Sequence, residues 1–244
     1  MELHGKVALV TGGAHRIGRG LVLALAEAGC DIVLVYNRSA RAAEQTAQEV
    51  VALGRRVVLQ QANLAEAAEV ATLIESAVVQ ELGTVQILVN SAAIFPEESL
   101  LGLTLAGWQK TMQVNLTSPL FLTQAFVRAL PEEMRGVVIN ITDWRTAKPY
   151  HNRFSYSVAK GGLDTFTLAA ANALAPRIRV NGIALGAMLP PPDGDEDYLA
   201  ELAAELPLAR PVAVHCHMRQ VKLSALTSCI LTLSYLPWFF LCAL

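Results

Sequence analysis

The chain is short of charged residues and of aromatic residues, and each shortage excludes a class of protein. Charged residues make up 16% of the 244 residues and aromatic residues 6%. The 19 Lys and Arg nearly balance the 21 Asp and Glu, giving a formal net charge of −2, so the basic excess of a nucleic-acid-binding protein is missing. At 53% hydrophobic residues, the sequence is too apolar for a disordered chain. Few aromatics beside many Ala, Val and Leu favour an α/β enzyme over an all-β sandwich.

Cysteine is also scarce, and its placement argues against disulfide and metal frameworks. The four cysteines lack the paired C-x-x-C spacing of metal sites. The segment His215–His217 (HCH) has metal-binding residue types, but side chains one residue apart point in different directions. We therefore expect no metal. The N-terminus has no basic stretch followed by an apolar core, so we expect no secretory signal and a cytoplasmic location.

Short runs rich in Val, Ile and Leu alternate with longer amphipathic stretches through most of the chain. The runs predict strands at Lys6–Val10, Asp31–Tyr36, Arg56–Gln60, Gln86–Asn90, Gly136–Ile141 and Ile178–Ile183. The stretches predict helices at Ile17–Ala28, Ala40–Leu53, Glu66–Leu82, Thr104–Leu130 and Ser155–Leu174. Continuously apolar strands are typical of a parallel sheet that helices cover on both faces. The pattern predicts a Rossmann-like, doubly wound α/β fold with its site at the carboxyl edge of the sheet.

The alternation stops near Pro211, so we predict a single domain over residues 1–211 and an atypical apolar tail over 212–244. The tail has no acidic residue, and residues 223–244 carry no charge. That stretch is long enough to cross a bilayer, and Arg219 and Lys222 precede it. We favour an altered tail, as from a shifted reading frame, over a membrane anchor. A membrane partner is expected only if the anchor alternative holds.

A glycine-rich turn, Thr11–Gly18 (TGGAHRIG), follows the first predicted strand. Such a turn between a strand and a helix directs backbone N–H groups and the positive helix end toward a phosphate. Gly12 permits the tight turn, and Gly18 permits close packing of the helix. We assign five residues here to a dinucleotide cofactor, with an ordinary βα turn as the alternative: Gly12, His15, Arg16, Ile17 and Gly18.

The end of the second predicted strand indicates which dinucleotide binds. NAD sites usually place an acid there, but this chain has Tyr36, Asn37, Arg38 and Ser39, which we also assign to the cofactor. Arg38 and Ser39 can hold a 2′-phosphate through charge-assisted hydrogen bonds, and Arg16 adds a second positive charge. The sequence therefore favours NADPH over NADH. The alternative is that Arg38 is a solvated surface residue.

Tyr156 and Lys160 are four residues apart at the start of a predicted helix, so they share one helix face. A lysine cation favours the tyrosinate and lowers a pKa that is about 10 in an unperturbed tyrosine. A tyrosine tuned in this way can pass a proton to a reduced substrate near neutral pH. An ordinary surface pair is the alternative.

Together these motifs resemble the short-chain dehydrogenase/reductase family, over about Leu3 to Pro211. The matching residues include Asn63 and Leu64 after the third strand, Asn90 and Ala92 after the fourth, Asn115, Tyr156 and Lys160. The resemblance implies a small-molecule substrate and a homodimer or homotetramer. It also implies that Tyr156 and Lys160 bind the nicotinamide ribose and that Asn115 holds a water in a proton relay.

The same resemblance implies that Asn63, Leu64, Asn90, Ala92 and Gly186 contact the cofactor. Asn63 and Asn90 could instead satisfy loop backbone, and Asn115 could simply pack in the long helix. The family's usual Pro-Gly after strand six is Leu185-Gly186 here, which keeps the glycine's backbone freedom. After Pro211 no further helix, seventh strand or Asp-Gly-Gly closure is visible, so we expect the usual seventh strand to be missing.

Within the family the chain is most similar to the pteridine reductases. Arg16 replaces the middle glycine of the turn, and Phe95 sits where that subgroup stacks a pterin ring. Asp143, thirteen residues before Tyr156, stands where the family usually has serine and the subgroup has aspartate. The resemblance makes Arg16, Phe95, Asp143 and Tyr156 the substrate-binding residues. The alternatives are that Phe95 belongs to the core and that Asp143 is a structural cap while Thr142 supplies the hydroxyl.

The aspartate also bears on the reaction. An ionised Asp143 would repel the oxyanion that forms during carbonyl reduction, whereas a protonated one can donate a hydrogen bond, and burial favours the protonated form. We therefore expect an NADPH-dependent oxidoreductase acting on a dihydropterin or dihydrofolate, with Asp143, Tyr156, Lys160 and Asn115 as catalytic residues and Tyr156 as proton donor. The alternatives are a carbonyl or alcohol oxidoreductase and an inactive NADPH-binding protein.

Overall fold

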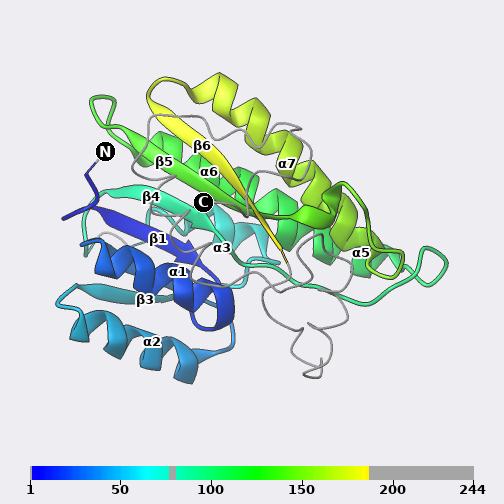
Figure 1. Cartoon of the computed structure of the whole chain (residues 1–244), viewed down its shortest axis with the longest axis horizontal. Helices are drawn as coiled ribbons and strands as arrows, with labels where there is room; N and C mark the ends of the chain where they lie inside the picture. The colour runs from blue at the N-terminus through cyan, green and yellow to red at the C-terminus, as the bar shows by residue number, and fades with distance from the viewer. Residues whose placement is uncertain (1, 77–80, 187–244) are drawn as a thin grey trace.

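The computed structural model describes residues 2–76 and 81–186, and a six-stranded parallel sheet forms their centre (Figure 1). The strands are β1 (Val7–Thr11), β2 (Asp31–Tyr36), β3 (Val57–Gln61), β4 (Val85–Asn90), β5 (Gly136–Asp143) and β6 (Ile178–Leu185). Their order across the sheet is β3-β2-β1-β4-β5-β6, and every neighbouring pair is parallel. This confirms the predicted Rossmann-like, doubly wound fold. The predicted domain end at 211, the tail and any seventh strand lie outside the described residues.

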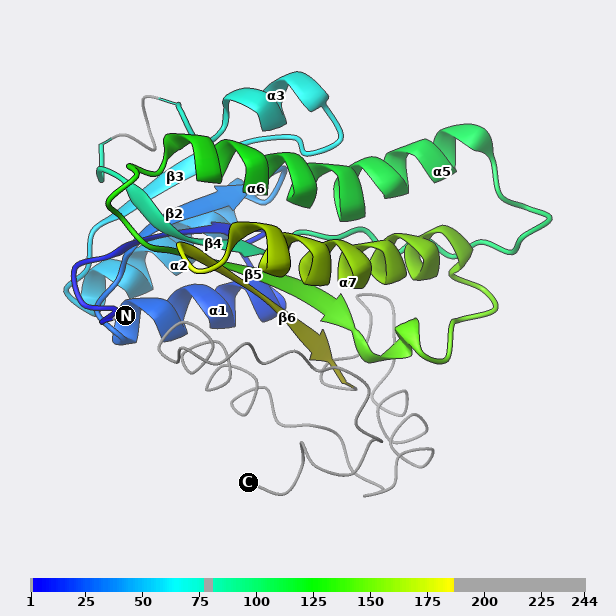
Figure 2. The same ribbon diagram turned by 90° about the horizontal axis from the view of Figure 1, so that it is seen from above.

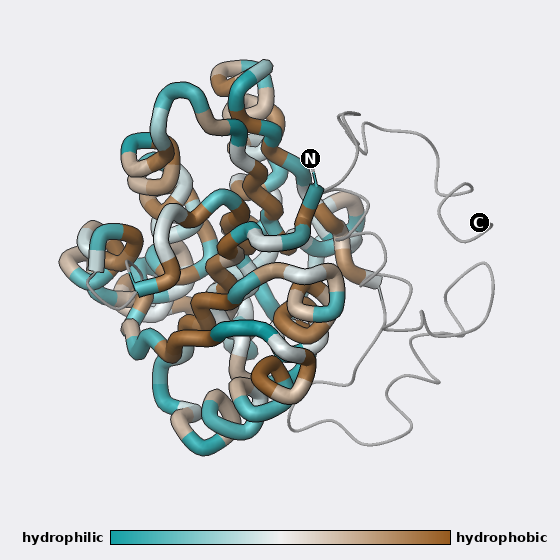
Figure 3. The backbone as a smooth tube through the Cα atoms, turned by 90° about the vertical axis from the view of Figure 1, so that its left-hand side faces the viewer, coloured by the Kyte–Doolittle hydropathy of each residue, from teal (hydrophilic) through white to brown (hydrophobic). Residues whose placement is uncertain are grey.

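Helices cover both faces of the sheet (Figure 2). On one face lie α1 (Arg16–Glu27) and α2 (Ala40–Ala52), and on the other lie α3 (Ala67–Thr72), α5 (Leu105–Met112), α6 (Ser118–Ala129) and α7 (Phe154–Leu174). Two apolar clusters fill the layers, one including Leu25 of α1 and Val50 of α2, the other Phe126 of α6 and Ala170 of α7. Hydrophobic segments accordingly run through the middle of the chain trace, with hydrophilic loops around them (Figure 3).

The long helical region predicted at Thr104–Leu130 is divided in the structure into three pieces. Between α5 and α6 lies a π-helical segment, η1 (Gln113–Thr117). Pro119 stands in the first turn of α6 and has no N–H to donate to the carbonyl of Asn115 four residues earlier, so the hydrogen-bond ladder changes there. The interruption falls at Asn115, one of the predicted site residues.

The helix predicted at Glu66–Leu82 was wrong in its extent. Helix α3 ends at Thr72, and turns follow at residues 73–75. Leu73 and Ile74 are nevertheless buried. The apolar spacing therefore continues beyond the end of the helix, so it could not show where the helix ends. Residues 77–80 lie outside the described part of the chain.

In the described ranges, no helix is both long enough and apolar enough to cross a membrane. The apolar residues 223–244 lie outside those ranges, so the anchor alternative stays a prediction.

Candidate active site

The turn after β1 packs directly onto the loop after β4, and this packing requires glycine. Gly12 has φ of +67°, and a Cβ there would lie 2.9 Å from the Cα of Ala92. A Cβ on Gly18 would collide with the carbonyl oxygen of Gly12. The hydroxyl of Thr11 accepts hydrogen bonds from the N–H groups of Ser91 (3.0 Å) and Ala92 (3.1 Å). The two loops therefore form one rigid floor where the chain order reverses between β1 and β4.

Arg16 begins α1 with a φ of +54°, a left-handed conformation that favours glycine. A glycine would adopt this conformation without strain, so the arginine is held there against a local backbone cost. The side chain of His15 does not cap α1, and the first turn contains no acidic residue. The positive end of the helix is therefore not neutralised by its own sequence.

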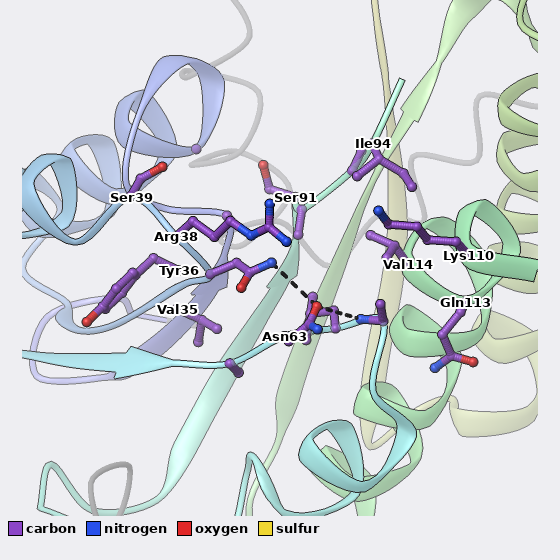
Figure 4. A pocket seen from close by; sticks show the side chains of 18 of the residues that line it. Val35, Tyr36, Arg38, Ser39, Asn63, Ser91, Ile94, Lys110, Gln113 and Val114 are labelled. Carbon is purple, nitrogen blue, oxygen red and sulfur yellow. Dashed lines mark hydrogen bonds between the residues drawn. The ribbon is translucent and has the colours of Figure 1, made fainter. Parts of the chain in front are cut away.

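A cleft of about 1200 Å³ lies over this floor. Twelve predicted cofactor residues line it: Gly12, His15, Arg16, Ile17, Gly18, Tyr36, Asn37, Arg38, Ser39, Asn63, Leu64 and Ala92. Among the described residues its lining does not include Asn90, Tyr156, Lys160 or Gly186. Figure 4 shows Arg38 on one wall and Lys110 and Gln113 of α5 and η1 on the other, and the last two were not anticipated. Nothing in the local sequence indicates that the side chains of Lys110 and Gln113 line the cleft.

Asn63 and Asn90 have different surroundings in the structure. Asn63 lies on the cleft wall (Figure 4), and its Oδ1 accepts a hydrogen bond from the side chain of Asn37 at 3.4 Å. Asn90 is buried, and its amide donates to Oδ1 of Asn140 at 2.8 Å. This contact favours a structural role for the Asn90 side chain, and its predicted cofactor contact stays a prediction.

At the carboxyl end of β5, Asp143 and Tyr156 are joined directly. The Tyr156 hydroxyl donates to Oδ2 of Asp143 at 2.7 Å, and Oδ1 accepts the N–H of Arg145 at 2.8 Å. Asp143 therefore both caps the short 3-10 helix η2 (Trp144–Thr146) and contacts Tyr156, so the two interpretations of this residue are compatible. Burial raises the pKa of the Asp143 carboxyl, although hydrogen bonds from Tyr156 and Arg145 and the charge of Lys160 oppose the rise.

Lys160, one helical turn after Tyr156, is buried next to the Asp143–Tyr156 pair. It is 3% exposed, its Nζ donates to the carbonyl of Ile141 at 2.6 Å, and it lies 5.9 Å from the centre of the Tyr156 ring. Burial lowers the pKa of Lys160 to about 8, against the opposing charges of Asp143 and Asp164. Asp164 was missed by the sequence analysis, although its spacing of four from Lys160 on a helix was a usable signal. It accepts hydrogen bonds from Thr146 and Thr142, which directs the Thr142 hydroxyl to Asp164.

The family model for short chain dehydrogenases matches residues 6–196. The chain belongs to the short-chain dehydrogenase family. A 3-oxoacyl-[acyl-carrier-protein] reductase of Synechocystis sp. is 35% identical over 210 residues, covering 85% of this chain and 84% of that protein. The structure of FolM alternative dihydrofolate reductase 1 from Brucella canis, complexed with NADP, is 34% identical with a TM-score of 0.86, covering 91% and 88% of the two chains. An angucycline C-6 ketoreductase, LanV, with bound NADP is 25% identical with a TM-score of 0.83, covering 92% and 90%.

In this short-chain dehydrogenase, Asn115 binds the loop after β4. Its side chain is fully buried, Oδ1 accepts the N–H of Ile94 at 2.9 Å, and Nδ2 donates to the Ile94 carbonyl at 2.8 Å. The π-helical segment thus fixes the loop that leads to Phe95. The predicted relay role of Asn115 stays a prediction.

Phe95 of the dehydrogenase lies against the candidate proton donor. Its ring centre is 4.5 Å from that of Tyr156 and 5.5 Å from that of Tyr150, both nearly perpendicular to it. The Arg153 guanidinium lies 4.3 Å over one face of the ring. A planar ligand stacked on Phe95 would therefore have to use the opposite face of the ring. The predicted stacking role of Phe95 is limited to that face.

Within residues 2–76 and 81–186 of the dehydrogenase, no group of three or more His, Cys, Asp and Glu side chains is arranged to hold a metal ion. The segment His215–His217 lies outside these residues.

Proposed function

We propose that this chain is an NADPH-dependent reductase of planar, nitrogen-containing rings of the dihydropterin or dihydrofolate type, with Tyr156 as the proton donor. The observation that carries the proposal is the 2.7 Å hydrogen bond between the Tyr156 hydroxyl and a partly buried Asp143 carboxyl whose pKa is raised. A carboxyl of this kind holds its proton closer to neutral pH than an exposed aspartate does.

The cleft fits the proposed cofactor. Gly12 and Gly18 leave the turn without side chains where backbone approach is closest, and Arg16 and Arg38 place two cations along the same cleft. The segment at the end of β2 has no carboxylate to oppose a 2′-phosphate. The Brucella canis relative, which was crystallised with NADP, supports this choice. When bound, NADPH supplies the hydride.

The side chains of the protein then donate and transfer the proton that the reduction requires. Tyr156 gives the proton of its hydroxyl to a ring nitrogen, and Asp143, when protonated, is within hydrogen-bond reach to return one to the Tyr156 oxygen. The Lys160 ammonium lies 5.9 Å from the centre of the Tyr156 ring, where its charge favours the tyrosinate. We assign to Asn115 the predicted role of holding a water in the proton relay. We assign the stacking of a flat substrate to the face of Phe95 that Arg153 does not cover. Once Asp143 has given up its proton it is ionised and would oppose the oxyanion of a carbonyl reduction, which is why a ring nitrogen suits this pair better.

A carbonyl reductase is the second candidate, because a relative at 35% identity is named as a 3-oxoacyl-[acyl-carrier-protein] reductase. The two candidates share the tyrosine and the lysine and differ in what Asp143 contributes. The cytoplasmic location and the homodimer or homotetramer expected from the sequence stay predictions.

The proposed function is tested by following NADPH absorbance with purified chain and a dihydropterin, dihydrofolate, a panel of ketones, or no substrate. We expect oxidation with the reduced pteridines, and its loss in Tyr156→Phe. Turnover of ketones alone would replace the proposal with the second candidate. NADPH-induced thermal stabilisation without turnover of any substrate would indicate the inactive binding protein.

A further inference from the structure

The loop after β4 is fastened to the segment that enters α7, next to Tyr156. The N–H of Glu98 donates to the carbonyl of Asn152 at 2.9 Å, and Glu98 and Arg153 form an isolated parallel bridge. The Asn152 side chain donates to Glu97 at 2.9 Å. We call residues 97–98 and 152–155 the clasp. It joins two segments that are distant in sequence through both backbone and side-chain contacts.

The centre of the clasp is the Glu98 carboxylate. Its Oε1 accepts the N–H of Ser155 at 3.0 Å and also the Ser155 hydroxyl. Ser155 is fully buried in the first turn of α7, where the N-cap residue Arg153 makes no side-chain capping bond and no acidic residue occurs. Glu98, 57 positions earlier in the sequence, therefore supplies the helix cap that α7 does not encode locally.

The clasp also fixes the aromatic neighbour of Tyr156. Nη1 of Arg153 donates to the carbonyl of Phe95 at 2.9 Å, while its guanidinium covers the Phe95 ring. The Phe95 ring in turn contacts the Tyr156 ring. Tyr156 is thus restrained from two sides, through the helix backbone at Ser155 and through the ring of Phe95.

We propose that Glu98 is a positioning residue that sets the Tyr156 hydroxyl against the Asp143 carboxyl. It acts through Ser155 and makes no contact of its own with the reacting group. The inference rests on the proposed reductase function, because it concerns the tyrosine that donates the proton in that function. Small displacements of a reacting group cost large factors in rate, so loss of the carboxylate acceptor should lower kcat more than cofactor affinity.

The test compares Glu98→Gln, which keeps an acceptor oxygen, with Glu98→Met, which keeps the length and removes both acceptors. Glu133→Gln, an exposed glutamate remote from the clasp, is the matched control. We expect Glu98→Met to lower kcat about tenfold or more with the KM for NADPH within about twofold. Glu98→Gln should recover kcat to within about threefold of the wild-type value, and the control should match the wild type.

A second readout is independent of turnover. Hydrogen exchange of the Ser155 amide should accelerate about tenfold or more in Glu98→Met, while the amides of β4 keep wild-type protection. In Glu98→Gln the Ser155 amide should stay protected. If Glu98→Met fails to fold, shown by the absence of a cooperative thermal unfolding transition, Ser155→Ala takes its place, with an expected fall in kcat of about threefold and an unchanged KM for NADPH.

Wild-type kcat in Glu98→Met, or equal losses in Glu98→Met and Glu98→Gln, would overturn the positioning role, as would wild-type kcat in Ser155→Ala where that variant is the substitute. If the wild-type chain oxidises NADPH with none of the tested substrates, the proposed function fails on its own. The exchange of the Ser155 amide then still decides whether Glu98 holds the start of α7, and unchanged exchange in Glu98→Met would refute it.

Discussion

Replacing Asp143 by asparagine separates its two roles. Asparagine keeps one acceptor oxygen, which can replace Oδ1 and accept the N–H of Arg145, so the 3-10 turn should persist. Its NH2 group then replaces Oδ2 and can donate to the Tyr156 oxygen, but it cannot supply an acidic proton. The variant therefore keeps a hydrogen bond at each position and removes the proton that we assign to Asp143.

The expected size of the effect follows from the contact that is weakened. A hydrogen bond between neutral groups contributes about 0.5–1.5 kcal/mol, and about 1.4 kcal/mol corresponds to a tenfold change in rate. We therefore expect kcat with a dihydropterin to fall by about 2- to 13-fold in Asp143→Asn, measured as NADPH oxidation at saturating cofactor.

The raised pKa of Asp143 also predicts how kcat changes with pH. Burial raises the pKa of Asp143, and the protonated carboxyl is the working form, so wild-type kcat should fall as the pH rises through that raised pKa. The same limb should be missing in Asp143→Asn. A variant with wild-type kcat and an unchanged pH profile would refute the reasoning, because Asp143 would then be only a cap.

Three further predictions concern the cofactor cleft and the sheet. Arg38→Leu should raise the KM for NADPH about tenfold and leave the KM for NADH nearly unchanged, and equal effects on both cofactors would contradict a 2′-phosphate contact. Gly18→Ala should abolish the thermal stabilisation by NADPH, whereas Gly161→Ala, whose added Cβ meets no atom within 4 Å, should keep it. Asp31→Asn should lower the free energy of unfolding by about 2–3 kcal/mol, since the buried Asp31 pairs with two arginines at 2.5 and 2.7 Å. Burial opposes ionisation of Asp31, but the two arginines hold its pKa below the usual value. This stabilisation should therefore be present above about pH 4 and be lost as the pH falls through the lowered pKa. If the variant and the wild type have the same free energy of unfolding at neutral pH in chemical denaturation, the ion pair is not a stabilising contact.

The sheet and the cofactor turn could be predicted because their signals are local. Continuous apolar runs such as Asp31–Tyr36 mark strands buried on both faces, and the spacing of Gly12 and Gly18 reflects contacts with nearby backbone. The strand order β3-β2-β1-β4-β5-β6 is one of the few that right-handed crossovers allow, and the structure shows which one is used. These features need no knowledge of side chains that are distant in sequence.

What could not be predicted depends on distant partners. Nothing around Glu98 shows that its carboxylate caps a helix 57 positions later, and nothing in the pattern near Asn115 shows that both its polar atoms bind Ile94. The position of Asp143 was predicted, but whether it caps a turn or contacts Tyr156 required the structure, which shows both. The end of α3 at Thr72 escaped prediction because burial continues beyond it.

In the proposed reaction Asp143 suits the reduction of a ring nitrogen rather than of a carbonyl. The decisive measurement is the ratio of kcat/KM for a dihydropterin to kcat/KM for a ketone, in the wild-type chain and in Asp143→Ser. We expect a ratio well above one in the wild type and a fall of about tenfold or more in the serine variant. A ratio that does not change between the two proteins would contradict it.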